Sequence, residues 1–118
     1  MGWDMKKVND EGLSSAMRKY LIGKELKSRL QKAEEDYVHA LEIGDSDYVE
    51  SHKLNRKGQI AAALGEECHL SAATVIGYGK YADALEQVRE KNEALVQQIL
   101  AGETRMTYQE LRKVVGVL

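Results

Sequence analysis

The sequence contains no proline and no phenylalanine, and its only cysteine is Cys68. No position therefore carries the proline ring that interrupts a helix interior. The residues with the highest helix propensities, which are Ala, Leu, Glu, Lys, Gln, Arg and Met, supply much of the chain. A lone cysteine cannot form an intramolecular disulfide. This composition predicts an all-α fold that is held together without covalent cross-links.

Long apolar runs are also missing. The longest, Ile60–Leu64, is far shorter than the roughly 20 residues that cross a bilayer. The N-terminal Met-Gly-Trp-Asp is unlike the basic and apolar start of a signal peptide, and Lys6 stands where a myristoylation signal has Ser or Thr. We therefore expect a cytoplasmic protein that has no membrane partner.

Excess charge of one sign is the third absence. The chain has 17 Lys and Arg against 19 Asp and Glu, a net charge of -2, so it lacks the strongly basic balance typical of dedicated nucleic-acid binders. Its 118 residues are 43% hydrophobic and 31% charged. Length and composition together predict one globular domain.

Hydrophobic spacing divides the chain into helices. Residues 1–12 show no apolar period and are expected to form a flexible arm, followed by a single helical domain over 13–118. Apolar residues then recur at intervals of three and four from Ser14 or Ser15, both suitable N-caps, to about Ile43. Gly44 is the expected C-cap of this long helix. Gly23 is an interior weak point at which the helix is expected to bend.

The remaining segments are shorter. Residues 44–54 are expected to form a connection with about one helical turn after Asp45 or Asp47. Helices are expected over 56–68, over 71–91 with a break near Gly77 and Gly79, and over 93–101. A capping box, Thr107 with Glu110, predicts the start of a last helix that ends by Gly116.

Residues 59–78, QIAAALGEECHLSAATVIGY, have the spacing of a helix-turn-helix. Ile60, Leu64 and Cys68 share one face of the first helix, and Gly65 is the small residue that allows close approach. Leu70 is the expected buried turn residue, and Ser71 is the expected N-cap of the second helix. His69 stands where such turns usually have glycine, because the backbone tends to take a positive φ there, which His tolerates better than most residues. We interpret residues 56–79 as a central helix-turn-helix in a compact multi-helix domain with a long N-terminal helix.

In this interpretation Val75 and Tyr78 face the first helix of the motif. The outward residues of the second helix then lack Arg, Lys, Asn and Gln, the side chains that read base edges most strongly, so weak sequence preference is expected. Phosphate contacts are expected from the ends of the motif and from a basic cluster on the long helix; a solvated helix face is the competing interpretation of these charges. The expected DNA-binding residues are Arg56, Lys57, Ser71, Ala72, Ala73, Thr74, Ile76, Gly77, Lys80, Arg18, Lys19 and Lys24.

Three stretches together resemble a known family. They are RKYLIGK at 18–24, RKGQIAAALGEECHLSAATVIGYGKYADALEQV from Arg56 onward, and ILAGETRMTYQELRKVV near the end. In this order they resemble the DNA-binding half of ParB-like partition proteins over about residues 16–115. The resemblance implies an all-helical fold and binding of double-stranded DNA in plasmid partition, transfer or transcriptional regulation. It does not imply CTP hydrolysis or clamp formation, because residues 1–118 hold no counterpart of the family's nucleotide-binding domain.

No arrangement of residues predicts an enzyme or a bound cofactor. Cys68 and His69 are adjacent, so they point in different directions and do not form a nucleophile and base pair. His39, His52 and His69 lack metal-ligand spacing, and Asp45-Ser46-Asp47 is not followed by the other ligands of a calcium loop. The alternative to DNA binding is a protein-protein interaction module in which the small apolar face of Ala72, Ala73 and Ile76 packs against a partner or a second copy. A homodimer is compatible with both functions.

Overall fold

The computed structural model describes the backbone of residues 12–52 and 56–117, and the side chains of these residues apart from 50–52, 56 and 117. The described part contains helices and turns and no strand, as the composition predicts. The expected arm over 1–12 lies outside the described residues except for Gly12. The helices are α2 (Ser15–Ile43), α3 (Ser46–His52), α4 (Arg56–Cys68), α5 (Ala72–Arg89), α6 (Glu93–Leu100) and α7 (Tyr108–Val117).

Helix α2 has the predicted ends. The Ser14 hydroxyl accepts a hydrogen bond from the Met17 amide at 3.0 Å, and Gly44 closes the helix with a φ of 73°. Gly23 does not interrupt the helix. It is buried where α2 crosses α5, and a Cβ built on it would lie 2.2 Å from the carbonyl oxygen of Tyr78. The absence of a side chain at this position therefore serves close packing of two helices.

Two of the sequence predictions need correction. The connection after Gly44 contains a seven-residue helix, α3, which is longer than the single turn expected. Helix α5 is continuous over 18 residues, without the predicted break at Gly77 and Gly79. Gly79 is buried beside Leu26, whose Cδ2 would lie 3.1 Å from an added Cβ. Tertiary packing thus outweighs the low helix propensity of glycine.

The last two helices begin with side-chain caps. The Asn92 side chain accepts from the Leu95 amide at 3.1 Å at the start of α6. At the start of α7 the Thr107 hydroxyl accepts from the Glu110 amide at 3.1 Å, and the Glu110 carboxylate accepts from the Thr107 amide at 3.2 Å. This is the predicted capping box.

Helices α2 and α5 contribute to both hydrophobic clusters of the molecule. The first cluster joins α2, α4 and α5 through Ile22, Leu26, Ala61, Leu64 and Val75. The second joins α2, α5, α6 and α7, and its largest fully buried side chains are Leu85, Val88, Val96, Ile99 and Leu111. The α2–α5 crossing therefore ties α4 to the C-terminal helices.

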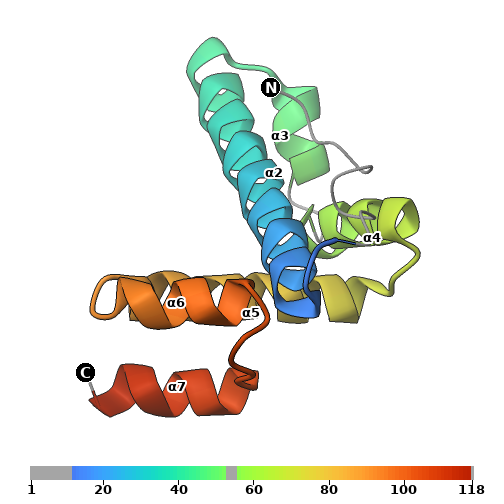
Figure 1. Ribbon diagram of the computed structural model, residues 1–118. Helices are drawn as coiled ribbons and strands as arrows, with labels where there is room; N and C mark the ends of the chain where they lie inside the picture. Colours follow the sequence, from blue (N-terminus) through green and yellow to red (C-terminus); the bar gives the residue numbers. More distant parts are fainter. Residues whose placement is uncertain (1–11, 53–55, 118) are drawn as a thin grey trace.

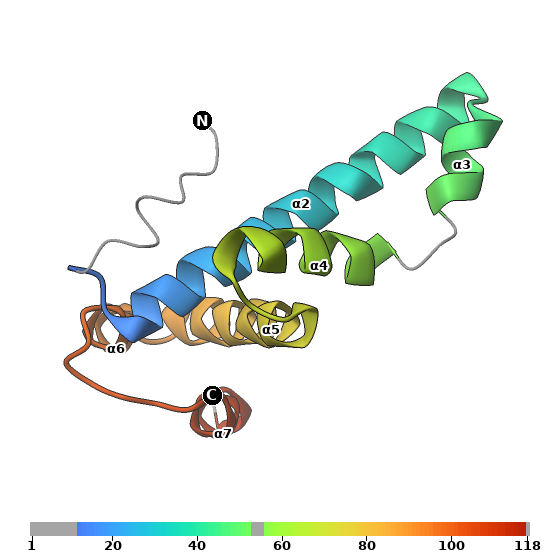
Figure 2. The same cartoon turned by 90° about the vertical axis from the view of Figure 1, so that its right-hand side faces the viewer.

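Helices α2, α4, α6 and α7 pack around α5. Both views place α4 above α5 and α7 below it, with α6 alongside (Figure 1, Figure 2). The outer part of α2 extends away from this group, and α3 folds back against it (Figure 2). None of the described helices has a stretch that is long and apolar enough to cross a membrane.

Candidate nucleic-acid interface

The turn between α4 and α5 has the geometry that its sequence predicts. His69 has a φ of 60°, and the Leu70 amide donates to the Gly65 carbonyl at 2.8 Å. A Cβ on Gly65 would lie 2.4 Å from the Leu70 carbonyl oxygen, so any larger residue would push the turn away from α4. Leu64 and Val75, one from each helix, are fully buried. The two helices are therefore fixed relative to each other by backbone contacts as well as by apolar packing.

The N-terminus of α5 is capped by Ser71. Its hydroxyl accepts from the Thr74 amide at 3.2 Å and lies 2.8 Å from the Thr74 hydroxyl. Ser71 is exposed and Thr74 is partly buried. The two hydroxyl groups expected to contact bases are thus hydrogen-bonded to each other, which reduces their capacity to read a sequence.

The outward face of α5 is narrower than the sequence predicts. Ala73 and Gly77 are exposed, and nothing lies within 4 Å of a Cβ built on Gly77. Ala72 and Ile76 are instead partly buried against the cluster around Leu64 and Val75, so the expectation that both face outward is wrong. The cluster that covers them contains Ile22 and Leu26 of α2 as well as Ala61 and Leu64 of α4.

Helix α7 covers the later turns of α5. A groove between the two helices is lined by Lys80 and Asp83 from α5 and by Tyr108 and Arg112 from α7. Lys80 remains exposed at the edge of this groove. The exposed residues of α5 are Ala73 and Gly77 in its first two turns, and Lys80 and Gln87 further along.

The three basic residues of α2 that were expected to bind DNA do not lie together. Arg18 and Lys19 line one pocket with Cys68, Leu70 and Tyr78, so they lie beside the turn of the motif. The Lys19 Nζ lies 6.0 Å from the centre of the Tyr78 ring. Lys24 does not line this pocket.

Lys24 Nζ lies 5.2 Å from the centre of the Tyr20 ring. Tyr20 faces Glu86 in the later part of α5, away from the turn of the motif. The three residues expected to form one cluster thus contribute two, Arg18 and Lys19, to the surface near the turn. On α4, Lys57 is exposed in the first turn, and Arg56 is the first residue of the helix, with a side chain outside the described set.

The acidic residues of the motif are partly neutralised. The guanidinium of Arg29 donates to the two carboxylate oxygens of Glu67 at 2.6 and 3.1 Å, and it also bonds Glu25. This charged hydrogen bond holds the pKa of the Glu67 carboxyl below its ordinary value. Glu66 stays exposed. The other acidic clusters, Glu34-Glu35-Asp36 and Asp45-Ser46-Asp47, lie on the outer part of α2 and at the start of α3.

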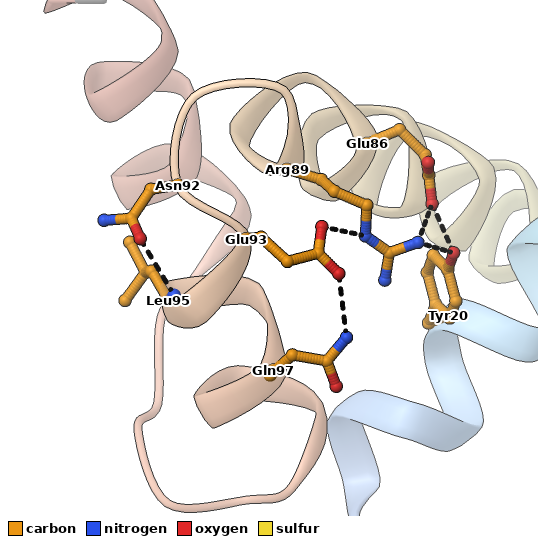
Figure 3. A network of polar contacts seen from close by, with 7 residues as sticks. All are labelled: Tyr20, Glu86, Arg89, Asn92, Glu93, Leu95 and Gln97. Atoms are coloured by element: carbon orange, nitrogen blue, oxygen red, sulfur yellow. Dashed lines mark hydrogen bonds and ion pairs between the residues drawn. The ribbon is translucent and has the colours of Figure 1, made fainter.

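A polar network fixes the angle at which α2 meets α5 (Figure 3). The Tyr20 hydroxyl donates to the Glu86 carboxylate and accepts from Arg89 Nη1 at 3.2 Å. Arg89 Nε lies 3.4 Å from a Glu93 carboxylate oxygen, which extends the network to α6. Burial, and next the hydrogen bond to Glu86, raises the pKa of Tyr20. This network could not be predicted from the sequence, because Tyr20 is far along the chain from Glu86 and Arg89.

Cys68 is not activated as a nucleophile in this arrangement. Burial raises the pKa of the Cys68 thiol, which opposes formation of the reactive thiolate. Within residues 12–52 and 56–117, no three His, Cys, Asp or Glu side chains are grouped as metal ligands would be. What this surface combines is an accessible helix N-terminus, flanking cations and a rigid turn.

Comparisons of the chain with protein-family models, with curated proteins and with solved structures find no match.

Proposed function

We propose that this protein binds double-stranded DNA through the helix-turn-helix formed by α4 and α5. The observation that carries the proposal is the turn itself: a left-handed His69, a Gly65 in contact with the Leu70 carbonyl, and a Ser71 cap that leaves the start of α5 accessible. In such proteins the second helix enters the major groove with its N-terminal residues, while the first crosses the backbone. Here α5 is the helix that reads the groove.

Charge distribution supports this orientation. Lys57 on α4, Arg18 and Lys19 on α2, and Lys80 on α5 lie around the motif, while the acidic clusters of α2 and α3 lie on the projecting part of the molecule. The net charge of -2 thus includes basic residues near the motif as well as the acidic clusters of α2 and α3. Phosphate attraction depends on the local charges and is compatible with this balance.

Sequence preference is expected to be weak. The exposed residues in the first turns of α5 are Ala73 and Gly77, which offer no hydrogen bonds to base edges, and Ser71 shares its hydroxyl with Thr74. A bidentate base contact is worth about 1–3 kcal/mol of discrimination. A protein without one binds DNA mainly through its backbone. The biological setting that we propose is the one implied by the ParB-like resemblance: partition, transfer or regulation of a mobile element.

Fluorescence anisotropy with labelled duplexes of unrelated sequence tests this function. Each phosphate contact adds about 0.9 to the slope of log affinity against log salt. We expect salt-dependent binding by the wild-type chain, and a slope lower by about 1.8 in the Arg56→Ala/Lys57→Ala variant. The matched control is Lys91→Ala/Lys113→Ala, which removes two exposed charges from other parts of the surface. Absence of binding at low salt would refute the function.

A protein-protein module is the second candidate, and the outer part of α2 favours it. Among the described residues, the exposed large hydrophobic side chains are Val38, Leu41 and Ile43, with exposed fractions of 46, 53 and 63%. All three lie on the projecting part of α2 and not on α5. Self-association through them predicts a dimer in sedimentation experiments that Leu41→Lys abolishes. A chain that stays monomeric at high concentration would contradict self-association through this surface.

A further inference from the structure

Two grooves meet on the side of α5 that faces α7. The first, of about 370 Å³, lies between α5 and the start of α7 and is lined by Thr74, Gly77 and Tyr108 among others. The second, of about 510 Å³, lies between the start of α2 and the α6–α7 connection and is lined by Ser14 and Arg105 among others. Both are lined by Lys19, Tyr81, Met106 and Thr107. The two grooves therefore lie next to each other, and together we call them the α7-side furrow.

Two cationic side chains and one anionic side chain line this furrow. Lys19 lines both grooves, and Arg105 is exposed in the second. The one carboxylate among the lining residues is that of Glu110, and it accepts the Thr107 amide in the α7 capping box. Hydroxyl groups of Ser15 and Thr104 lie along the same walls. Two cations with neighbouring hydroxyl groups make a surface suited to a sugar-phosphate backbone.

The furrow is continuous with the accessible start of α5. Thr74 and Gly77 belong both to the first turns of α5 and to the wall of the first groove. Helix α4 lies on the other side of α5: both views show α4 above α5 and α7 below it (Figure 1, Figure 2). Lys57 is exposed in the first turn of α4. Candidate phosphate-binding side chains thus flank the reading helix on both sides.

Duplex geometry requires such an arrangement. A helix about 10–12 Å across fills a major groove about 12 Å wide, so it faces one sugar-phosphate backbone on each side. The start of α4 supplies contacts to one of these backbones in a helix-turn-helix. The second backbone then passes on the α7 side of α5.

We propose that the α7-side furrow holds this second sugar-phosphate backbone, with Lys19 and Arg105 as its phosphate-binding cations. The inference rests on the proposed function, since it assigns the other strand of the same duplex. It adds to the DNA-contacting surface a segment, the α6–α7 connection, that lies outside the helix-turn-helix and was not among the residues expected from the sequence. Sequence-independent contacts here also compensate for the few hydrogen-bonding groups on α5.

The test compares three double variants of the full chain by anisotropy from 50 to 300 mM salt. Lys19→Ala/Arg105→Ala is expected to lower the slope of log affinity against log salt by about 1.8, and to weaken binding at 150 mM salt by roughly 10- to 30-fold. Lys91→Ala/Lys113→Ala removes the same net charge from residues that line neither groove, and it should change both quantities much less. Lys19→Arg/Arg105→Lys keeps both charges and should bind like the wild type.

The outcomes separate the two proposals. If wild-type protein binds DNA and Arg56→Ala/Lys57→Ala weakens it, while the furrow variant behaves like the Lys91/Lys113 control, the furrow inference is wrong and the proposed function stands. Equal weakening in the furrow and control variants would also overturn the inference, because overall charge would then explain both. Wild-type protein that binds no duplex would refute the proposed function itself. Arg105→Glu, a change at an exposed position, keeps the test valid if replacement of Lys19 unfolds the chain.

Discussion

Gly23 and Tyr78 meet at the crossing of α2 and α5, where the Tyr78 carbonyl oxygen would lie 2.2 Å from a Cβ built on Gly23. The Cβ of Ala82 would lie 2.9 Å from the same atom. The obstacle is backbone, which cannot turn aside as a flexible side chain can. These contacts limit how closely α5 can approach α2.

Replacing Gly23 by Ala should therefore destabilise the fold, although alanine is the better helix former. Overpacking of this kind costs about 1–3 kcal/mol, more than the roughly 1 kcal/mol gained in helix propensity. Gly77→Ala is the matched control, since nothing lies within 4 Å of its added Cβ, and it should be stabilising by up to about 1 kcal/mol. Urea unfolding measures both. Equal stabilisation by the two substitutions would show that the crossing relaxes freely.

Substitutions of His69 test the backbone strain in the turn between α4 and α5. Its φ of 60° is strained for a residue with a side chain, so His69→Gly should raise the free energy of unfolding by about 1 kcal/mol. His69→Val, whose branched side chain is poorly compatible with this φ, should lower it by at least as much. Thermal unfolding followed by circular dichroism gives both values. A destabilising glycine here would mean that the imidazole makes a contact worth more than the strain.

Glu67 is expected to give part of the acid sensitivity of the protein. Arg29 lowers its pKa in the folded chain, so the stabilisation is fully present above the ordinary carboxyl pKa and is lost as the pH falls through the lowered one. Glu67→Gln should remove this part of the pH dependence below about pH 5. The effect is small, under about 1 kcal/mol, because the side chain is 40% exposed and the pair is screened. Urea midpoints at pH 3 to 7 measure it, with Glu66→Gln as the control.

Removal of the Tyr20 hydroxyl should loosen α2 from α5. Tyr20→Phe deletes the donor to Glu86 and the acceptor for Arg89, and it should cost about 1–2 kcal/mol because the partners are charged. Tyr78→Phe removes a hydroxyl from a partly buried ring at the same crossing and should cost less than about 0.5 kcal/mol. If the two substitutions cost the same, the network in Figure 3 contributes no more than an ordinary surface contact.

The features that the sequence predicts correctly are local ones. The caps at Ser14, Gly44 and Ser71 and the capping box at Thr107 depend on residues within four positions of each other, so their chemistry is visible in the order of residues. The positive φ of His69 belongs to the same class. The turn of the motif is set by such short-range geometry, and it could therefore be placed to the residue.

The features that the sequence does not predict depend on residues that are far apart along the chain. Ala72 and Ile76 are partly buried against a cluster built from α2, α4 and α5, and the pairing of Arg29 with Glu67 joins residues on two helices. The position of Arg105 in a groove with Lys19 depends on the path of the α6–α7 connection. One sequence shows which side chains are charged, but it does not show which of them the fold brings together.

The two ends of α2 differ in how firmly they are held. The inner end takes part in both hydrophobic clusters, whereas beyond Leu26 the buried residues of this helix are Ala33 and Ala40. Leu30 still packs, partly buried, against the first cluster. The two alanines beyond it bury little apolar surface, so the turns around Ala40 can open without disturbing either cluster. Backbone amides near Leu26 should then exchange their hydrogens only on global unfolding, and those near Ala40 much sooner. A single uninterrupted helix would thus contain two regions of different local stability.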